Sequence, residues 1–171
     1  MSEWITFRVG TPSTRQNWSN PDCTPFHAVY HVSHIIPSLS ILQNKKIHAG
    51  LVFDESKLNK DRLLVSWVSP NHWSPGSRYG TVQFCFDLRQ LIQGKNYYWV
   101  ESIAYGVRAC RILVTPNEHK GLAQYDPTVG DGPWWYDKDK DEHYFNGNYC
   151  LELMLEEDLA IDAETTLTRG Q

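Results

Sequence analysis

Hydrophobic residues alternate with polar ones over short runs of the chain and rarely recur at helical spacing. Residues 81–87 show the clearest alternation, because Val82, Phe84 and Phe86 share one face, and this run predicts a strand. Runs rich in β-branched and aromatic residues predict further strands at 4–9, 29–33, 63–68, 96–103, 108–115 and 150–155. Many strands with few long helices favour an α+β fold over alternating α/β units.

Two short helices are expected beside these strands. The apolar set from Leu39 to Leu42 lies at near-helical spacing, with Ser38 as its cap and the run Asn44-Lys-Lys at its end. A second helix, of one or two turns, follows the alternating strand and ends at Gly94.

The segment 117–147 has no apolar period, and we expect a long aromatic and acidic loop there. It contains Trp134 and Trp135, followed by three aspartates at alternate positions from Asp137. These repeat the first ligand spacings of a calcium loop, but Glu142 stands where that loop needs glycine, so an EF-hand is excluded. Long loops inside compact domains are usually functional or disordered. We interpret this one as a target-engaging loop, whose aromatic rings could stack on bases at roughly 1–3 kcal/mol per base.

Length and composition predict one domain that covers 1–171. Single cores commonly span about 100 to 200 residues, and 41% hydrophobic residues supply enough material for such a core. The four cysteines lie far apart without a C-x-x-C motif, which favours reduced thiols over disulfides or a zinc site. We find neither a signal peptide nor an apolar run of membrane length, and we expect a cytoplasmic protein without membrane contact.

Polar side chains stand out in two otherwise apolar strands. His31 and Ser33 project to the face opposite Tyr30 and Val32. Glu152 interrupts the last apolar strand, facing away from its leucines. A carboxylate is costly to bury unpaired, so Glu152 should line a cleft or meet a cation. The alternative for His31 is a buried ring that satisfies local hydrogen bonds.

The run Tyr30-His-Val-Ser-His, which leads into a short apolar helix and the Ala49-Gly turn, resembles the opening of the ADP-ribosyltransferase fold. Within that fold it is similar to the DarT family of DNA ADP-ribosyltransferases, and more distantly to the His-Tyr-Glu group that includes poly-ADP-ribose polymerases. The resemblance implies a split β-sheet core with short flanking helices, and NAD as the substrate. It also implies that His31 binds the nicotinamide ribose and amide, with Ser33 beside it.

The catalytic residue of that family is a glutamate on a late strand. By resemblance this residue is Glu152, and Glu101, at the end of the run Tyr97-Tyr-Trp-Val, is the alternative. The ordinary role of Glu101 would be a surface charge at a strand end.

The resemblance further implies a nicotinamide clamp on the second core strand and in the loop that follows it. The residues implied are Ser66, Trp67, Asn71, Trp73, Arg78 and Tyr79. Arg78 could pair with a diphosphate in a fork, and Tyr79 offers a stacking face to a ring. The chain departs from the family at Asn71-His72, where relatives have an Asn-Pro-type turn. The alternative is a turn whose aromatic residues fill a surface groove.

These residues would support cleavage of the bond between ribose and nicotinamide through an oxocarbenium-like state. Glu152 would stabilise the positive sugar and hold a ribose hydroxyl, while His31 binds the other hydroxyl. Loss of one such electrostatic group commonly lowers the rate by about 10²–10³. No metal is required.

The acceptor of ADP-ribose is expected to be a base of DNA or RNA. Residues 1–125 carry 13 Lys and Arg against 8 Asp and Glu, whereas 126–171 carry 3 against 12. The basic excess could meet phosphates, and Trp73, Trp134 and Trp135 could stack on bases. A protein side chain or water is equally open as acceptor. The family likeness implies a toxin or a phage-conflict effector, with a protein inhibitor or antitoxin as a further partner.

A rival interpretation comes from another class of protein. A non-catalytic, aromatic-rich domain could bind protein or carbohydrate through a groove of Trp73, Trp134 and Trp135, with His31 and Glu152 purely structural. The two interpretations differ in geometry, because only the enzyme needs His31 and Glu152 on one cleft.

Overall fold

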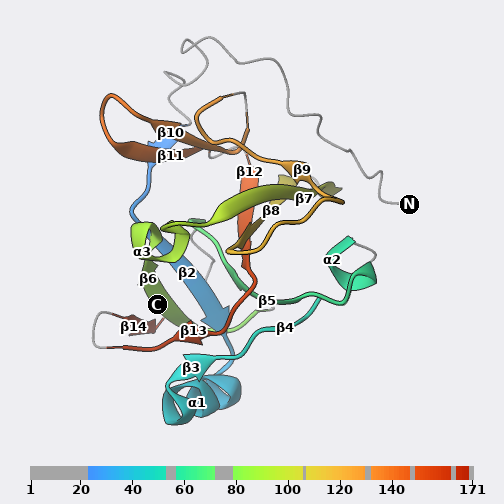
Figure 1. Ribbon diagram of the computed structural model, residues 1–171. Helices are drawn as coiled ribbons and strands as arrows, with labels where there is room; N and C mark the ends of the chain where they lie inside the picture. Colours follow the sequence, from blue (N-terminus) through green and yellow to red (C-terminus); the bar gives the residue numbers. More distant parts are fainter. Residues whose placement is uncertain are drawn as a thin grey trace.

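The computed structural model describes residues 23–52, 57–71, 79–105, 107–129, 132–146, 149–162 and 165–169. Within these ranges the chain is an α+β structure made mainly of strands, with short helices (Figure 1). The α+β class expected from the hydrophobic pattern is therefore confirmed.

Most of the long apolar strands pair into one six-stranded sheet. Its spatial order is β4 (Gly50–Leu51), β5 (Leu64–Val68), β12 (Tyr149–Leu155), β8 (Val107–Thr115), β7 (Asn96–Tyr105) and β9 (Ala123–Gln124). Strands β12 and β8 run parallel, and the other neighbours are antiparallel. The expected strands at 63–68, 96–103, 108–115 and 150–155 all lie in this sheet.

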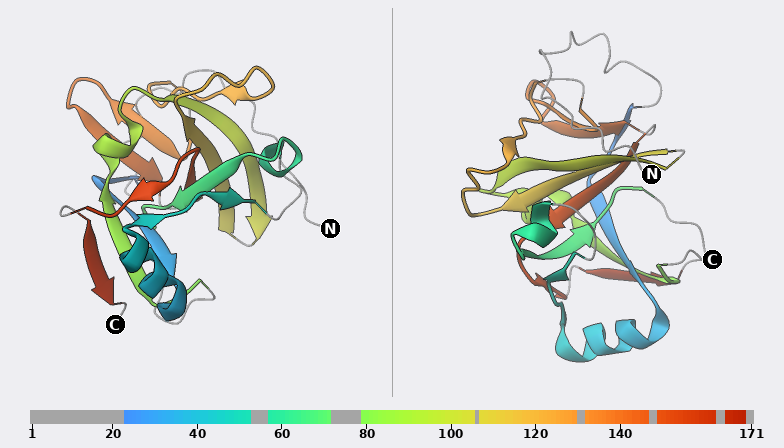
Figure 2. Two further views of the ribbon diagram at one scale, coloured as in Figure 1. Left: turned by 60° about the horizontal axis from the view of Figure 1, so that its bottom comes forward. Right: turned by 90° about the vertical axis from the view of Figure 1, so that its right-hand side faces the viewer.

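A second sheet meets the first at one corner. It consists of β14 (Thr166–Arg169), β6 (Val82–Asp87) and β2 (Ala28–Ser33), all antiparallel. Tyr30 and Ser69 exchange backbone hydrogen bonds of 2.8 and 2.9 Å, which join β2 to the chain just beyond β5. The two sheets thus touch at β2 and β5 and diverge from there (Figures 1 and 2).

The core fills the space between these sheets, as the alternation predicts. Phe84 and Phe86 on β6 are buried, and Val82 is half-buried. On β12, Leu151, Leu153 and Leu155 are each no more than 1% exposed. Burial of each such side chain stabilises the fold by roughly 1.5–3 kcal/mol. The opposite face of the large sheet carries a second apolar cluster of Leu58, Val65, Tyr98, Leu113 and Met154.

The three helices are short: α1 (Ile35–Asn44), α2 (Lys57–Lys60) and α3 (Leu88–Ile92), counted over the described ranges. Helix α1 begins earlier than expected, with His34 rather than Ser38 at its N-cap. The Ser38 hydroxyl instead donates to the His34 carbonyl oxygen at 2.7 Å, because it lies a full turn inside the helix. Lys45, in the left-handed conformation, ends α1. None of the helices described is both long and apolar enough to cross a bilayer.

The expectation of a structureless loop over 117–147 is wrong. Besides β9, the segment forms β10 (Trp134–Asp137) and β11 (Glu142–Asn146), which pair with β1 (Cys23–Pro25) in a third sheet. The aspartates make the turn of this hairpin, where Asp137 Oδ1 accepts from the Asp139 amide at 2.9 Å. The two strands are short and lack an apolar period, and the charged residues between them favour a loop, so the sequence does not predict these strands. A further pair, β13 (Leu159–Ala160) and β3 (Lys46–Ile47), completes the fold.

The adjacent tryptophans of this hairpin are packed. Trp134 is 1% exposed, and its Nε1 donates to His143 Nδ1 at 3.1 Å. Trp135 stacks on Tyr144 with 5.3 Å between the ring centroids. Trp134 is therefore a core residue and offers no surface to a base or a sugar.

Candidate functional site

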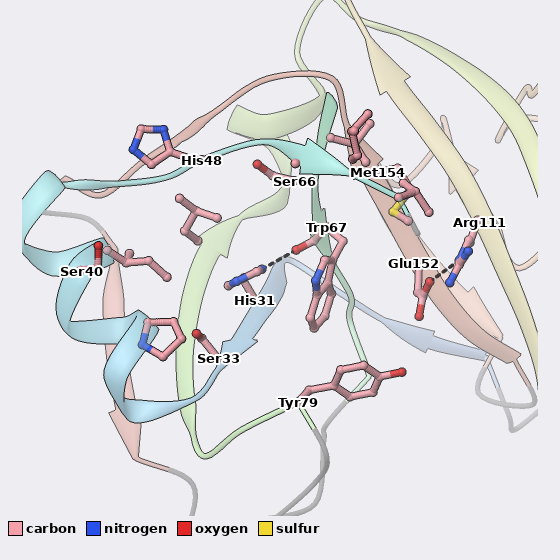
Figure 3. Close-up of a pocket in the computed structure, with 17 residues that line it drawn as sticks. His31, Ser33, Ser40, His48, Ser66, Trp67, Tyr79, Arg111, Glu152 and Met154 are labelled. Carbon is pink, nitrogen blue, oxygen red and sulfur yellow. Dashed lines mark hydrogen bonds and ion pairs between the residues drawn. The ribbon is translucent and has the colours of Figure 1, made fainter. Parts of the chain in front are cut away.

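A cavity of about 540 Å³ opens beside α1, near the corner where β2 approaches β5, and we call it the central cavity. Its size falls within the range of roughly 300–1,000 Å³ that is usual for small-molecule sites. Strands β2, β5, β8 and β12 and helix α1 all contribute to its wall. The polar and aromatic side chains that matter most are His31, Ser33, Trp67, Tyr79, Arg111 and Glu152 (Figure 3).

His31 projects from β2 into this cavity and is 8% exposed. Its Nδ1 lies 2.8 Å from the Trp67 carbonyl oxygen. A carbonyl oxygen can only accept, so Nδ1 carries the proton. Burial lowers the pKa of His31 from 6.5, against the smaller opposing effect of that hydrogen bond. A neutral ring therefore presents Nε2 as a hydrogen-bond acceptor, and Nε2 has no partner among the residues that the structure describes.

Glu152 lies on β12 and also lines the central cavity. Its Oε2 accepts from Arg111 Nε at 2.6 Å, and the two side chains are 14% and 19% exposed. The carboxylate thus both lines a cleft and meets a cation, as its place in an apolar strand predicts. His31 and Glu152, far apart along the chain, contribute to one cavity, with the Trp67 ring between them in the view of Figure 3.

Two aromatic rings form a wall beside these polar groups. The Trp67 ring lies 4.8 Å from the His31 ring and 5.7 Å from the Tyr79 ring, measured between centroids. Gly80 makes this arrangement possible, since its φ is +125° and a Cβ there would lie 2.1 Å from the Ser33 carbonyl. A flat ligand ring could stack on this wall.

The two expected serines reach the central cavity with their hydroxyls already engaged. Ser66 Oγ donates to the Glu157 carbonyl oxygen at 2.9 Å, and Ser33 Oγ makes a long contact of 3.4 Å to the His34 carbonyl oxygen. Each hydroxyl still offers lone pairs, so either serine can accept a hydrogen bond from a ligand.

Other expected site residues lie elsewhere. Asn71 is not among the described residues that line the central cavity, and its Oδ1 accepts from the Leu151 amide at 2.9 Å, which ties the loop to β12. Trp73 and Arg78 lie outside the described residues. Glu101 lies on β7, with its backbone opposite Arg111 in the strand register.

Sequence reasoning missed Arg111 and His48. Arg111 interrupts an apolar strand in which Cys110, Ile112 and Leu113 are fully buried, so the rule that singled out Glu152 also points to Arg111. His48 lies at the cavity rim with Nδ1 3.3 Å from Asp158, and no sequence pattern marks it.

The cysteine nearest to Glu152 along the chain is not suited to act as a nucleophile. Cys150 is a free thiol two residues before Glu152. Burial, and to a smaller extent the Glu152 charge, raises the pKa of this thiol to about 11. It therefore stays protonated near neutral pH and is a poor nucleophile. Among the residues described, no three His, Cys, Asp or Glu side chains cluster as a metal site would require.

The central cavity therefore combines an acceptor nitrogen, a carboxylate with its own cation, and an aromatic wall. Such a set can bind a polyhydroxylated ligand that carries a flat ring, and it can stabilise positive charge beside the carboxylate. Comparison with protein-family models, curated proteins and solved structures finds no match for this chain.

Proposed function

We propose that the chain is an NAD-dependent ADP-ribosyltransferase of split-sheet architecture, which releases nicotinamide and transfers ADP-ribose to a nucleic-acid base. The observation that carries this proposal is that His31 on β2 and Glu152 on β12 line the same cavity. The resemblance of the His31 strand and the Glu152 strand to the DarT family supplies the reaction class.

His31 and the aromatic wall hold the nicotinamide riboside. Nε2 of His31 accepts a hydrogen bond from a ribose hydroxyl, because Nδ1 already donates to the Trp67 carbonyl oxygen. The nicotinamide ring stacks on Trp67 or Tyr79. This grip places the scissile bond at a fixed position in the central cavity.

Glu152 acts on the charge that develops during cleavage. The electron pair of the bond between ribose and nicotinamide returns to the ring, and neutral nicotinamide leaves. The ribosyl carbon becomes cationic, and the Glu152 carboxylate stabilises that charge. A ring nitrogen or amine of the acceptor then donates its lone pair to this carbon, and the proton it loses passes to water.

A base of DNA or RNA remains the proposed acceptor. Its support is the family likeness and the excess of Lys and Arg over residues 1–125. Trp134 no longer adds to that support because it belongs to the core. Protein and water are therefore tested as acceptors beside DNA and RNA.

Release of nicotinamide from NAD tests the proposal. The purified chain is incubated with NAD alone and with DNA, RNA or protein, and both nicotinamide and labelled acceptor are quantified. We expect release that is fastest with nucleic acid and that falls about 10²–10³-fold in Glu152→Gln. Glu157→Gln is the matched control, since that carboxylate pairs with Lys95 outside the central cavity. No release with any acceptor, or full release from Glu152→Gln, would refute the assignment.

One observation favours the rival class, a domain that binds another protein without catalysis. Helix α1 exposes a row of apolar side chains, namely Ile35, Ile36, Leu39 and Leu42. The groove of tryptophans expected for that rival lacks Trp134. The same NAD assay separates the classes, because a binding domain releases no nicotinamide.

A further inference from the structure

We propose that Arg111 is a positioning residue of this reaction, which holds the Glu152 carboxylate turned so that one oxygen faces the substrate. This inference rests on the proposed function, since it concerns how the same site is kept ready to act. Arg111 does not belong to the sequence motifs on which the resemblance to the DarT family rests.

The geometry of the two strands places this pair. Strands β12 and β8 run parallel, and Glu152 and Arg111 are direct partners in their register, so their side chains emerge side by side from one face of the sheet. The contact joins Arg111 Nε to Glu152 Oε2 at 2.6 Å. Neighbouring core residues Ile112, Leu151 and Leu153 are at most 1% exposed, so the backbone beneath the pair is held by tight packing.

The contact also gives the two carboxylate oxygens of Glu152 different surroundings. Oε2 is held by Arg111, while Oε1 has no hydrogen-bond partner among the residues that the structure describes. In Figure 3 the second oxygen of Glu152 points away from Arg111. The pair therefore leaves one oxygen available for a ribose hydroxyl and fixes its direction.

Stability alone gives little reason for this ion pair. Both side chains are largely removed from water, and the desolvation of two charges commonly offsets their attraction. Apolar residues would suit these two strand positions as well, because the residues directly before and after each position, Cys110 and Ile112 on β8 and Leu151 and Leu153 on β12, are apolar and buried. The proposed role of the Glu152 carboxylate in the central cavity, to stabilise the ribosyl cation, explains the ion pair better than stability does.

Steady-state nicotinamide release over a range of NAD concentrations tests the inference. We expect Arg111→Gln to lower kcat about 10²-fold with little change in KM. Arg111→Lys, which keeps the charge but not the planar guanidinium, should recover about tenfold of that loss. Arg89→Gln is the matched control, since Arg89 pairs with Asp141 at 2.8 Å outside the central cavity.

Thermal unfolding of the same proteins separates positioning from simple loss of structure. The charge-free pair Arg111→Met with Glu152→Leu should be at least as stable as the wild type but without activity. If Arg111→Gln does not fold, Arg111→Lys decides, with a three- to tenfold lower kcat at unchanged KM as the expected result.

The results that overturn the inference differ from those that overturn the proposed function. If the wild type releases nicotinamide and a folded Arg111→Gln keeps full kcat, the role of Arg111 alone is overturned. Full kcat in Arg111→Lys has the same meaning when only that variant folds. Absence of release from the wild type overturns the proposed function, and the positioning role falls with it.

Discussion

At the scale of single residues, the protonation of His31 links the pH of the solution to substrate binding. The neutral ring donates through Nδ1 and accepts through Nε2, and burial lowers its pKa from 6.5. We expect KM for NAD to stay level down to pH 6.5 and to rise below it, because protonation converts Nε2 from acceptor to donor. Measurement of KM against pH checks this.

The His31→Gln variant supplies the comparison for that experiment. Loss of one hydrogen bond to substrate should raise KM about tenfold, and this variant should lose the rise of KM at low pH. His119→Gln serves as the control, because that ring pairs with Glu156 at 2.8 Å outside the central cavity. A KM that rises equally in His31→Gln would assign the titration to another group.

A second histidine is expected to affect stability rather than substrate binding. His143 accepts a hydrogen bond from the buried Trp134 indole, and burial is the main cause that lowers its pKa to about 4. The unfolded chain therefore binds the proton more readily between pH 6.5 and about 4, so stability falls as pH falls through that window. After allowance for solvent screening we expect a loss of about 1–2 kcal/mol.

Urea unfolding at pH 7 and pH 4.5 measures that loss. In His143→Gln the histidine contribution disappears, so the difference in unfolding free energy between the two pH values should shrink by the same amount. An unchanged difference would show that other groups cause the pH dependence. Carboxylates such as Glu156, whose pKa is lowered by hydrogen bonds that outweigh its burial, account for the remainder.

The residue scale also shows why half of the ion pair was missed. A charged side chain inside an apolar strand predicted the place of Glu152, and the same rule applied to Arg111 would have found its partner. The register that makes them neighbours joins β12 to β8 in parallel, and no local pattern predicts that pairing. Ser66 and Asn71 were singled out from the sequence as ligand-binding residues, but both already have hydrogen-bond partners in the fold. Those partners, Glu157 and Leu151, lie in distant parts of the chain, so the sequence could not reveal them.

At the scale of elements, alternation predicted strands well and failed where strands are short. The run 81–87 became β6, and the late apolar run became β12. Strands β10 and β11 were not predicted, because aromatic and charged residues occupy both of their faces and the aspartates between them make a turn. Helix α1 began earlier than predicted, because His34, in extended backbone directly after β2, takes the N-cap position without a side-chain cap that the sequence could reveal.

The approach of β6 to β2 depends on one glycine. Gly80 precedes β6 with φ of +125°, and an added Cβ would collide with the Ser33 backbone. Gly80→Ala should destabilise the fold by more than about 2 kcal/mol, since both the backbone conformation and the close approach forbid a side chain. It should also raise KM for NAD, because Tyr79 and Ser33 on either side line the central cavity.

Thermal or denaturant unfolding measures the first effect, with Gly50→Ala as the control. A Cβ at Gly50 meets nothing within 4 Å, so that substitution should change stability by less than about 0.5 kcal/mol. Equal stability of the two variants would mean that the contact between β6 and β2 is looser than described.

At the scale of the whole molecule, the site depends on two sheets that touch at one corner. The backbone bonds between Tyr30 and Ser69 fix that corner, and the central cavity opens beside it. The strands that supply His31 and Glu152 belong to different sheets, so no segment of the chain contains the site. The strand residues could be singled out from the sequence, whereas their meeting depends on sheet order.

The central claim is that His31 and Glu152 act on one bound NAD molecule. A crystal structure of the Glu152→Gln protein with NAD tests it most directly, because that variant should bind the substrate without cleaving it. The account predicts the nicotinamide ring against Trp67 or Tyr79, and a ribose hydroxyl within hydrogen-bond distance of His31 Nε2, with the other ribose hydroxyl facing residue 152. NAD bound outside the central cavity, or within it but away from either side chain, would contradict the account.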